Sequence, residues 1–252
     1  MAESPSTGPS SVPTAPGMLC VGSKSINTSV LDPEDFASWY EDTHVPDIQS
    51  TGGFSSTQRY ESMNFTKNHR NKDLSNVPEN KNFAYDFLTT YNMPDLHFRE
   101  SDEYKSLSNR AKPADKEIAQ KLFKQAEFFS RFCGQLSVDW PNEGAPATPY
   151  LVTLTSSSVK TAADLAVEIS KYSGCDRTRK YEVYEGSVLS GGERTYVPEK
   201  SELYLFDCSK VEPVSKIAKM TESAGDVQVG FWALKRAYDG AETTSKPWRP
   251  SK

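Results

Sequence analysis

The pattern of apolar and polar positions predicts one series of elements that occurs twice along the chain. Residues 18–26 (MLCVGSKSI) have the composition of a strand, and Asp32 and Pro33 suit the start of a helix that follows it. The pattern then predicts strands at 54–63 and 82–93, a charged helical stretch at 94–130 and a strand at 131–140. The predicted order is strand, helix, strand, strand, helix, strand.

The first predicted helix carries its larger side chains on one face. Four of them recur at spacings of three and four residues, namely Phe36, Trp39, Tyr40 and Thr43. Pro46 disfavours helical geometry in the residue before it, so we expect this helix to end near Val45. The polar stretch 64–81 is expected to be an exposed loop between paired strands.

The same order of elements starts again after a Pro-rich connector. It begins with the strand YLVTLTSS and a helix that we expect Gly174 to cap, and it closes with the strand VQVGFWALKRAY. The predicted segments are a disordered Pro/Ser-rich leader at 1–17, a first unit at 18–140, the connector at 141–149, a degenerate second unit at 150–238 and a flexible tail at 239–252.

A β-α-β-β-α-β unit is the ferredoxin-like motif, in which two helices cover one face of a four-stranded antiparallel sheet. Two such units can cover each other's open faces. The predicted fold class is therefore α+β, with two tandem ferredoxin-like units packed sheet to sheet as an intramolecular α+β barrel. A small, flat, hydrophobic ligand would bind between the two sheets, which are lined by Phe, Tyr and Trp.

Charge and composition narrow the range of partners. The formal net charge is 29 − 34 = −5 over 252 residues, so the chain lacks the basic field that holds phosphate backbones, and we expect no nucleic-acid partner. No stretch approaches the roughly 18 apolar residues that span a bilayer, and the first basic residue is Lys24. We expect a cytoplasmic protein with no membrane partner, and a homodimer stays open.

The cysteines fit neither a metal cluster nor a dense disulfide framework, because Cys20, Cys133, Cys175 and Cys208 lie far apart in the sequence. Most of them fall within strand-like apolar segments, where a free cysteine behaves as a small hydrophobe. We therefore interpret all four as reduced core residues. The three histidines are not spaced for shared coordination, so no metal site is expected.

One segment of about 25 residues concentrates aromatic side chains, an imidazole and a helix end. It contains Phe36, Trp39, His44, Pro46, Gly53, Phe54 and Tyr60. In this order they resemble the EthD-like branch of the dimeric α+β barrel superfamily, where a Phe, a Trp, a His followed by Pro and a Gly-Phe strand start recur. The second half has no such histidine, so we expect one histidine-dependent site per chain. The predicted tandem arrangement is similar to fungal members of the branch.

His44 is the predicted catalytic residue, because an imidazole titrates near neutral pH and can exchange a proton with a phenol, enol or β-keto acid. The alternative is a histidine that caps its helix. Four tyrosines are the predicted substrate-binding residues: Tyr40, Tyr60, Tyr85 and Tyr91. Tyr40 could orient the imidazole or only pack against it. Arg59 and Asp86 flank this face and would polarise a substrate only if they pointed inward.

The resemblance implies chemistry without a metal or an organic cofactor. Our leading prediction is an enzyme of secondary metabolism that acts on a small aromatic or polyketide-like molecule. It would catalyse a lyase-type step such as decarboxylation, cyclisation or dehydration, with His44 as general acid or base. The alternatives are a cofactor-independent monooxygenase of aromatic polyketides and a non-catalytic stress or carrier protein. Fold-level analogy carries much of this prediction.

Overall fold

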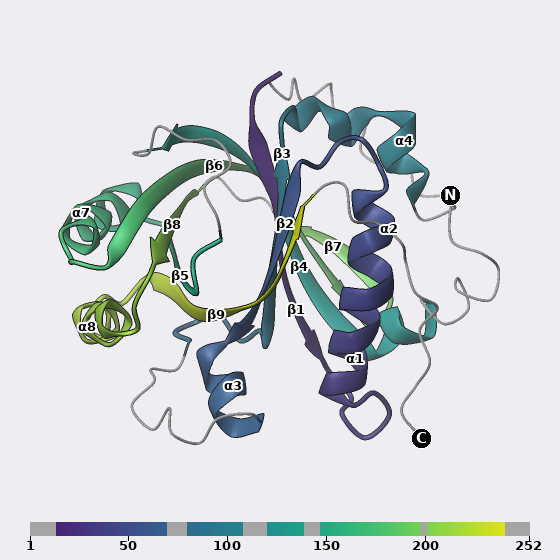
Figure 1. Cartoon of the computed structure of the whole chain (residues 1–252), viewed down its shortest axis with the longest axis horizontal. Coiled ribbons are helices and arrows are strands. Elements are labelled where there is room, and N and C mark those ends of the chain that lie inside the picture. The colour runs from purple at the N-terminus through teal and green to yellow at the C-terminus, as the bar shows by residue number, and fades with distance from the viewer. Residues whose placement is uncertain (1–13, 70–79, 108–119, 139–146, 198–200, 240–252) are drawn as a thin grey trace.

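Eight antiparallel strands close into a barrel in the computed structural model, which describes residues 14–69, 80–107, 120–138, 147–197 and 201–239 (Figure 1). The strands are β1 Gly17–Ser25, β2 Ser56–Ser62, β3 Phe87–Met93, β4 Ala126–Val138, β5 Tyr150–Ser156, β6 Cys175–Ser190, β7 Glu193–Val197, β8 Glu202–Cys208 and β9 Val227–Asp239. The helices are α1 Pro33–Trp39, α2 Val45–Gln49, α3 Met63–His69, α4 Asp102–Lys105, α7 Val159–Ser170 and α8 Glu212–Thr221, with a π-helical turn η1 at Tyr40–His44 and a 3₁₀ turn η2 at Leu96–Glu100.

The expected packing of two sheets face to face is wrong. The strand order is β4-β1-β3-β2-β9-β5-β8-β6, and β4 also pairs with β6, so the two halves join edge to edge into one closed barrel in which sheet dominates. Strand β7 adds to β6 outside the ring. An open four-stranded sheet leaves two edges with unpaired N–H and C=O groups, and closure of the barrel satisfies these groups. Face-to-face packing would have left them exposed.

Three apolar clusters follow from this closure, because strand residues alternate between the inside and the outside of the barrel. The interior cluster includes Met18, Tyr60, Leu88 and Trp232. A second cluster lies between α1 and the outer faces of β1, β3 and β4, and a third lies between α7, α8 and the outer faces of β5, β8 and β9. Helices α1 and α2 therefore cover one side of the barrel, and α7 and α8 cover the opposite side (Figure 1).

Several local predictions are confirmed. Strand β1 covers the predicted segment, and the Asp32 side chain accepts a hydrogen bond from the Glu34 N–H at 2.8 Å at the start of α1. In the second half α7 is present, but Gly174 is not its cap as predicted: the helix ends at Ser170 with Lys171 as its C-cap, and Gly174 at φ +99° lies in the turn into β6. That left-handed conformation is accessible to glycine at little cost.

Other local predictions are wrong. The helix does not end near Val45, because the wider turn η1 is followed directly by α2, in which Pro46 occupies the first turn and needs no N–H partner. The predicted loop 64–81 begins with α3, and Lys81 pairs with Val229 near its end. Strand β3 starts only at Phe87, and β4 starts at Ala126 within the predicted helical stretch 94–130.

The unit boundaries stay predictions. Several of the predicted segments lie at least partly outside the described residues. These parts are the leader up to residue 13, the connector at 139–146 and the tail from residue 240. Residues 70–79 of the predicted loop and 108–119 of the predicted helical stretch also lie outside them. Among the residues that the structure describes, no helix combines the length and the apolar character that a membrane crossing requires.

A buried ion cluster connects β6 and β8. The Asp207 carboxylate is fully buried and accepts hydrogen bonds from Arg177 Nε at 2.6 Å and from Arg179 at 2.9 Å through both Nε and a terminal nitrogen. Burial opposes ionisation of Asp207, but Arg179 and Arg177 hold its pKa below the usual range. These charge-assisted bonds fix the pairing of two barrel strands.

Candidate functional site

The segment α1-η1-α2 places His44 against the outer face of the barrel. A helix with 3.6 residues per turn changes its phase when a π turn inserts one residue, so η1 re-aims the side chains that follow it. Such π turns are frequent at functional sites. His44 is the last residue of η1 and faces the aromatic cluster between α1 and the barrel.

Aromatic rings surround the imidazole. The ring of Trp39 stacks on His44 at a centroid distance of 5.1 Å, Tyr40 meets it edge-on at 4.8 Å, and Phe123 lies at 6.1 Å. Burial first, and then the positive charge of Arg59, lower the pKa of His44 from 6.5 to about 4. The imidazole is therefore neutral at pH 7, the state in which it can accept a proton. It keeps partial contact with solvent.

Arg59 lies fully buried on β2 below this imidazole. Its guanidinium carbon is 4.0 Å from the centre of the Tyr40 ring and 4.5 Å from that of Phe87. One terminal nitrogen donates to Ser23 Oγ at 3.2 Å and to Thr89 Oγ1 at 2.7 Å. Within the described chain, its Nε and its other terminal nitrogen have no hydrogen-bond partner. Arg59 therefore carries a buried positive charge, and two of its three nitrogens donate no hydrogen bond within the described chain.

The carboxylates near Arg59 are engaged elsewhere. Glu41 Oε1 is 3.8 Å from Arg59 Nε, which is too long for a hydrogen bond. The Lys235 ammonium lies 2.9 Å from Glu41 Oε1 and 2.9 Å from Glu61 Oε1, so it bridges these two buried carboxylates. Glu41 thus opposes the positive charge of Arg59 without a hydrogen bond to it.

Two phenols complete the arrangement. Tyr91 donates a hydrogen bond to the Tyr40 oxygen at 3.1 Å, and both side chains are buried. Burial, together with the neighbouring Tyr40 phenol, raises the pKa of Tyr91 well above its usual value. Tyr91 therefore stays protonated near neutral pH and acts as a hydrogen-bonding group rather than as a base.

The structure brings together three of the five predicted site residues, namely His44, Tyr40 and Tyr91. The other two lie elsewhere. Tyr60 points into the barrel interior, and Tyr85 precedes β3 and stacks on Phe129 at 6.1 Å. The expected ligand space between two facing sheets does not form, because the sheets join edge to edge. Among the described residues, the rings of Phe83 and Trp232 pack at 5.5 Å in the barrel interior.

The sequence left the role of Arg59 open, because alternation alone cannot place it. Arg59 and Tyr60 lie on opposite faces of β2, as adjacent strand residues do, and both are buried because β2 is covered on both of its faces. The register shift beside them inserts Lys235 of β9 and leaves this alternation unchanged. The available signal was a charged residue inside an otherwise aromatic and β-branched strand.

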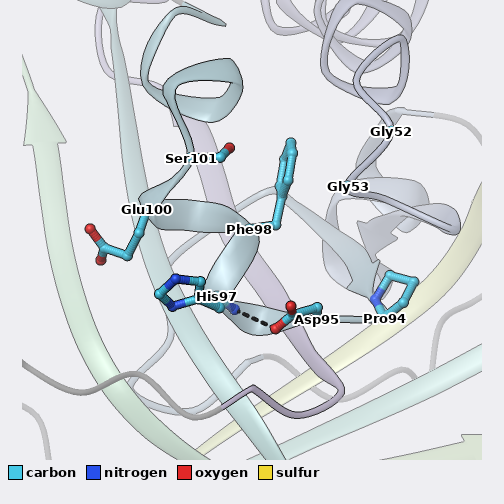
Figure 2. Close-up of a pocket in the computed structure, with 8 residues that line it drawn as sticks. All are labelled: Gly52, Gly53, Pro94, Asp95, His97, Phe98, Glu100 and Ser101. Carbon is cyan, nitrogen blue, oxygen red and sulfur yellow. Dashed lines mark hydrogen bonds between the residues drawn. The ribbon is translucent and has the colours of Figure 1, made fainter.

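A separate surface hollow of about 370 Å³ lies beside η2 (Figure 2). It is lined by Gly52, Gly53, Pro94, Asp95, His97, Phe98, Glu100 and Ser101. Asp95 accepts a hydrogen bond from the His97 backbone N–H at 2.9 Å, so its carboxylate serves as a cap of η2. In the part of the chain that the structure describes, no three His, Cys, Asp or Glu side chains gather so that they could hold a metal ion.

The low pKa of His44 predicts a pH-dependent loss of stability. In the unfolded chain the imidazole binds a proton below about pH 6.5, whereas the folded state resists protonation until about pH 4. The unfolded state therefore binds more protons in this window, and stability falls as the pH falls. Relative to His44→Gln, the wild type should lose about 1 to 3 kcal/mol between pH 7 and pH 4. Urea unfolding of both proteins at several pH values measures this difference, and parallel profiles would contradict it.

Comparison with known proteins identifies the fold. No family model and no curated protein matches the chain. Among solved structures, an anthrone oxidase-like protein aligns with a TM-score of 0.53 and 8% identity, over 93% of this chain and 97% of that chain. A protein from Lactobacillus acidophilus assigned to the monooxygenases aligns with a TM-score of 0.42 and 8% identity, over 90% of this chain and 97% of that chain.

A third structure, of a protein assigned as a chlorite dismutase, aligns with a TM-score of 0.44 and 12% identity, over 90% of this chain and 96% of that chain. The dimeric α+β barrel superfamily and its EthD-like branch stay predictions that rest on the segment around His44. At 8% identity the likeness to the anthrone oxidase-like protein speaks for the fold alone, and the chain shares the overall fold of that structure.

Proposed function

We propose that this chain is a cofactor-independent oxygenase that oxidises a small phenolic, anthrone-like substrate with dioxygen. The predicted lyase-type step finds no support in the comparisons, whereas the alternative prediction of a monooxygenase agrees with the anthrone oxidase-like neighbour. The observation that carries the proposal is the buried Arg59 guanidinium beside the neutral His44 imidazole. Together they offer a base and an anion-stabilising cation within an aromatic environment.

Proton transfer is the first step. The neutral His44 imidazole accepts the proton that the substrate loses on conversion from phenol or ketone to its anion. The buried positive charge of Arg59, which acts electrostatically on the imidazole, would also favour the negative charge that develops on the substrate. The rings of Trp39 and Tyr40 pack against the imidazole and limit its contact with water.

Dioxygen is the oxidant, and the substrate itself supplies the electrons. The substrate anion transfers one electron to dioxygen, and the resulting radical pair combines to form a carbon–oxygen bond in a peroxide anion. The imidazolium returns its proton to this peroxide, and loss of water leaves a ketone. The balance is R₂CH₂ + O₂ → R₂C=O + H₂O, so one oxygen atom enters the product and no external reductant is needed.

An oxygen-controlled substrate screen tests this proposal. Wild-type protein is incubated with a panel of anthrone-like phenols and β-keto acids, in air and under nitrogen, with thermal shift reporting binding and mass spectrometry reporting products. We expect a converted phenol whose product is heavier by about 14 Da, as the balanced reaction requires, and formed only in air. Equal conversion under nitrogen would contradict an oxygenase.

Variants of Arg59 test the role of its charge. Arg59→Met should lower turnover in air by about 10²- to 10³-fold, because it removes the cation that stabilises the substrate anion, whereas Arg59→Lys should keep part of the activity. Arg236→Met is the matched control, because Arg236 is a half-exposed cation of β9 that pairs with Asp42 at 3.0 Å. Wild-type turnover by a folded Arg59→Met protein would remove Arg59 from the mechanism.

A further inference from the structure

Two cysteines meet at one end of the strand pair β6–β8. These strands lie on the side of the barrel that α7 and α8 cover, whereas α1 and α2 lie on the opposite side (Figure 1). Cys175 is the first residue of β6, Cys208 is the last residue of β8, and the two are register partners in an antiparallel pair. A register shift at Asp176 lets the pair β6–β8 resume at Arg177 and Asp207. Both cysteines lie in the cluster beneath α7 and α8.

Their geometry is close to that of a disulfide. The two Sγ atoms are 3.3 Å apart, and both thiols are free. Directly opposed residues in an antiparallel pair have Cα atoms about 4.5 to 5.5 Å apart, within the range that a disulfide bridges. The sulfur atoms need to approach by about 1.3 Å to reach the bond length of about 2.0 Å. Side-chain rotation can supply a movement of this size.

The two thiols differ in access and in acidity. Cys175 is partly exposed, whereas Cys208 is fully buried. A hydrogen bond from the Cys208 thiol lowers the pKa of Cys175, which increases the share of its nucleophilic thiolate. Cys20 and Cys133, in contrast, are both buried in the barrel interior. An oxidant from solvent therefore meets Cys175 first.

We propose that Cys175 and Cys208 form a redox-active dithiol that hydrogen peroxide converts into a disulfide. The Cys175 thiolate attacks one peroxide oxygen, and the O–O bond breaks to give a sulfenic acid and, after protonation, water. The Cys208 sulfur then attacks the Cys175 sulfur, its proton leaves with the displaced hydroxide as a second water, and the S–S bond forms. In total two thiols lose two electrons and two protons to one H₂O₂, which gives two H₂O.

The disulfide would connect two helical segments. Cys175 follows the turn that ends α7, and Cys208 precedes the turn into α8, so the bond joins the two points where the chain leaves one helix and approaches the other. It also closes the chain segment that contains β7 and the β6–β7 hairpin. Restricting the unfolded chain in this way should raise the melting temperature by about 5 to 10 °C.

Peroxide treatment of the full chain tests the dithiol. The oxidised protein should lose about 2 Da, keep two alkylatable thiols of its four after unfolding, and yield a linked peptide pair containing Cys175 and Cys208. Cys175→Ser should show neither the bond nor the rise in melting temperature. Cys133→Ala, which removes a buried thiol of the barrel interior, should still form the bond.

Cys208→Ala provides a second test, because it leaves Cys175 without its resolving thiol. In this variant peroxide should drive Cys175 to sulfinic acid, with a mass increase of about 32 Da. The proposal is overturned if peroxide leaves all four wild-type thiols alkylatable, if wild-type Cys175 is itself converted to sulfinic acid, or if the mapped bond joins a different pair.

Discussion

Replacement of His44 by glutamine is expected to lower kcat for the oxygen-dependent reaction by about 10²- to 10⁴-fold. Glutamine keeps a polar side chain of similar reach but cannot accept the proton that the substrate loses. The imidazole can do so at neutral pH, because burial and the charge of Arg59 keep it deprotonated. Substrate binding should change far less than kcat, since glutamine keeps the polarity and approximate size of the side chain and leaves the packing of Trp39 and Tyr40 in place.

His97→Gln is the matched control for this experiment. It makes the same substitution at an exposed histidine of η2, whose backbone rather than its ring contributes to the cap. This variant should turn over at the wild-type rate. If His97→Gln loses turnover while His44→Gln keeps it, the reaction belongs to the hollow beside η2 and our assignment is wrong.

The second large effect is expected for Asp207→Ala, which should lower the free energy of unfolding by about 3 to 5 kcal/mol. The substitution leaves Arg177 and Arg179 without the carboxylate that accepts their hydrogen bonds. Arg179 has only 7% of its side chain exposed, so water cannot replace the lost partner fully. An uncompensated buried charge is more costly than the intact pair is stabilising.

Urea unfolding measures this loss, and Asp164→Ala provides the control. Asp164 pairs with Lys160 at 2.5 Å on α7, but its side chain is 67% exposed, so removal of its carboxylate should change stability by no more than about 0.5 kcal/mol. A loss below about 1 kcal/mol for Asp207→Ala would show that the ion cluster does not hold β6 and β8 together.

Local signals in the sequence predicted those elements whose cause is local. Asp32 and Pro33 start α1 as their chemistry requires, and the alternation from Met18 predicts β1. The closure of the barrel has no such local signal. It depends on pairing of β2 with β9 and of β4 with β6, and the partners in these pairs lie far apart in the sequence. Face-to-face packing and edge-to-edge pairing use the same alternating strands, so the pattern could not decide between them.

In the candidate site, too, the sequence predicted local relations between residues but not those that depend on the tertiary fold. His44 and Tyr40 are four residues apart and were predicted to share a helical face, and in the structure they remain neighbours across the π turn. Arg59 and Tyr60 alternate across the barrel wall as a period of two requires, with Tyr60 in the interior and Arg59 against the outer rings of Tyr40 and Phe87. Because both faces of β2 are buried, the sequence pattern could not show which face belongs to the site.

Oxygen uptake coupled to product formation tests the central claim most directly. Wild-type protein and His44→Gln are supplied with an anthrone-like phenol in an oxygen-electrode cell, and the product is quantified by mass spectrometry from the same samples. The account predicts one O₂ consumed per ketone formed by the wild type, and a rate lower by about 10²-fold or more for His44→Gln. Product formation without oxygen uptake, or equal rates for the two proteins, would contradict it.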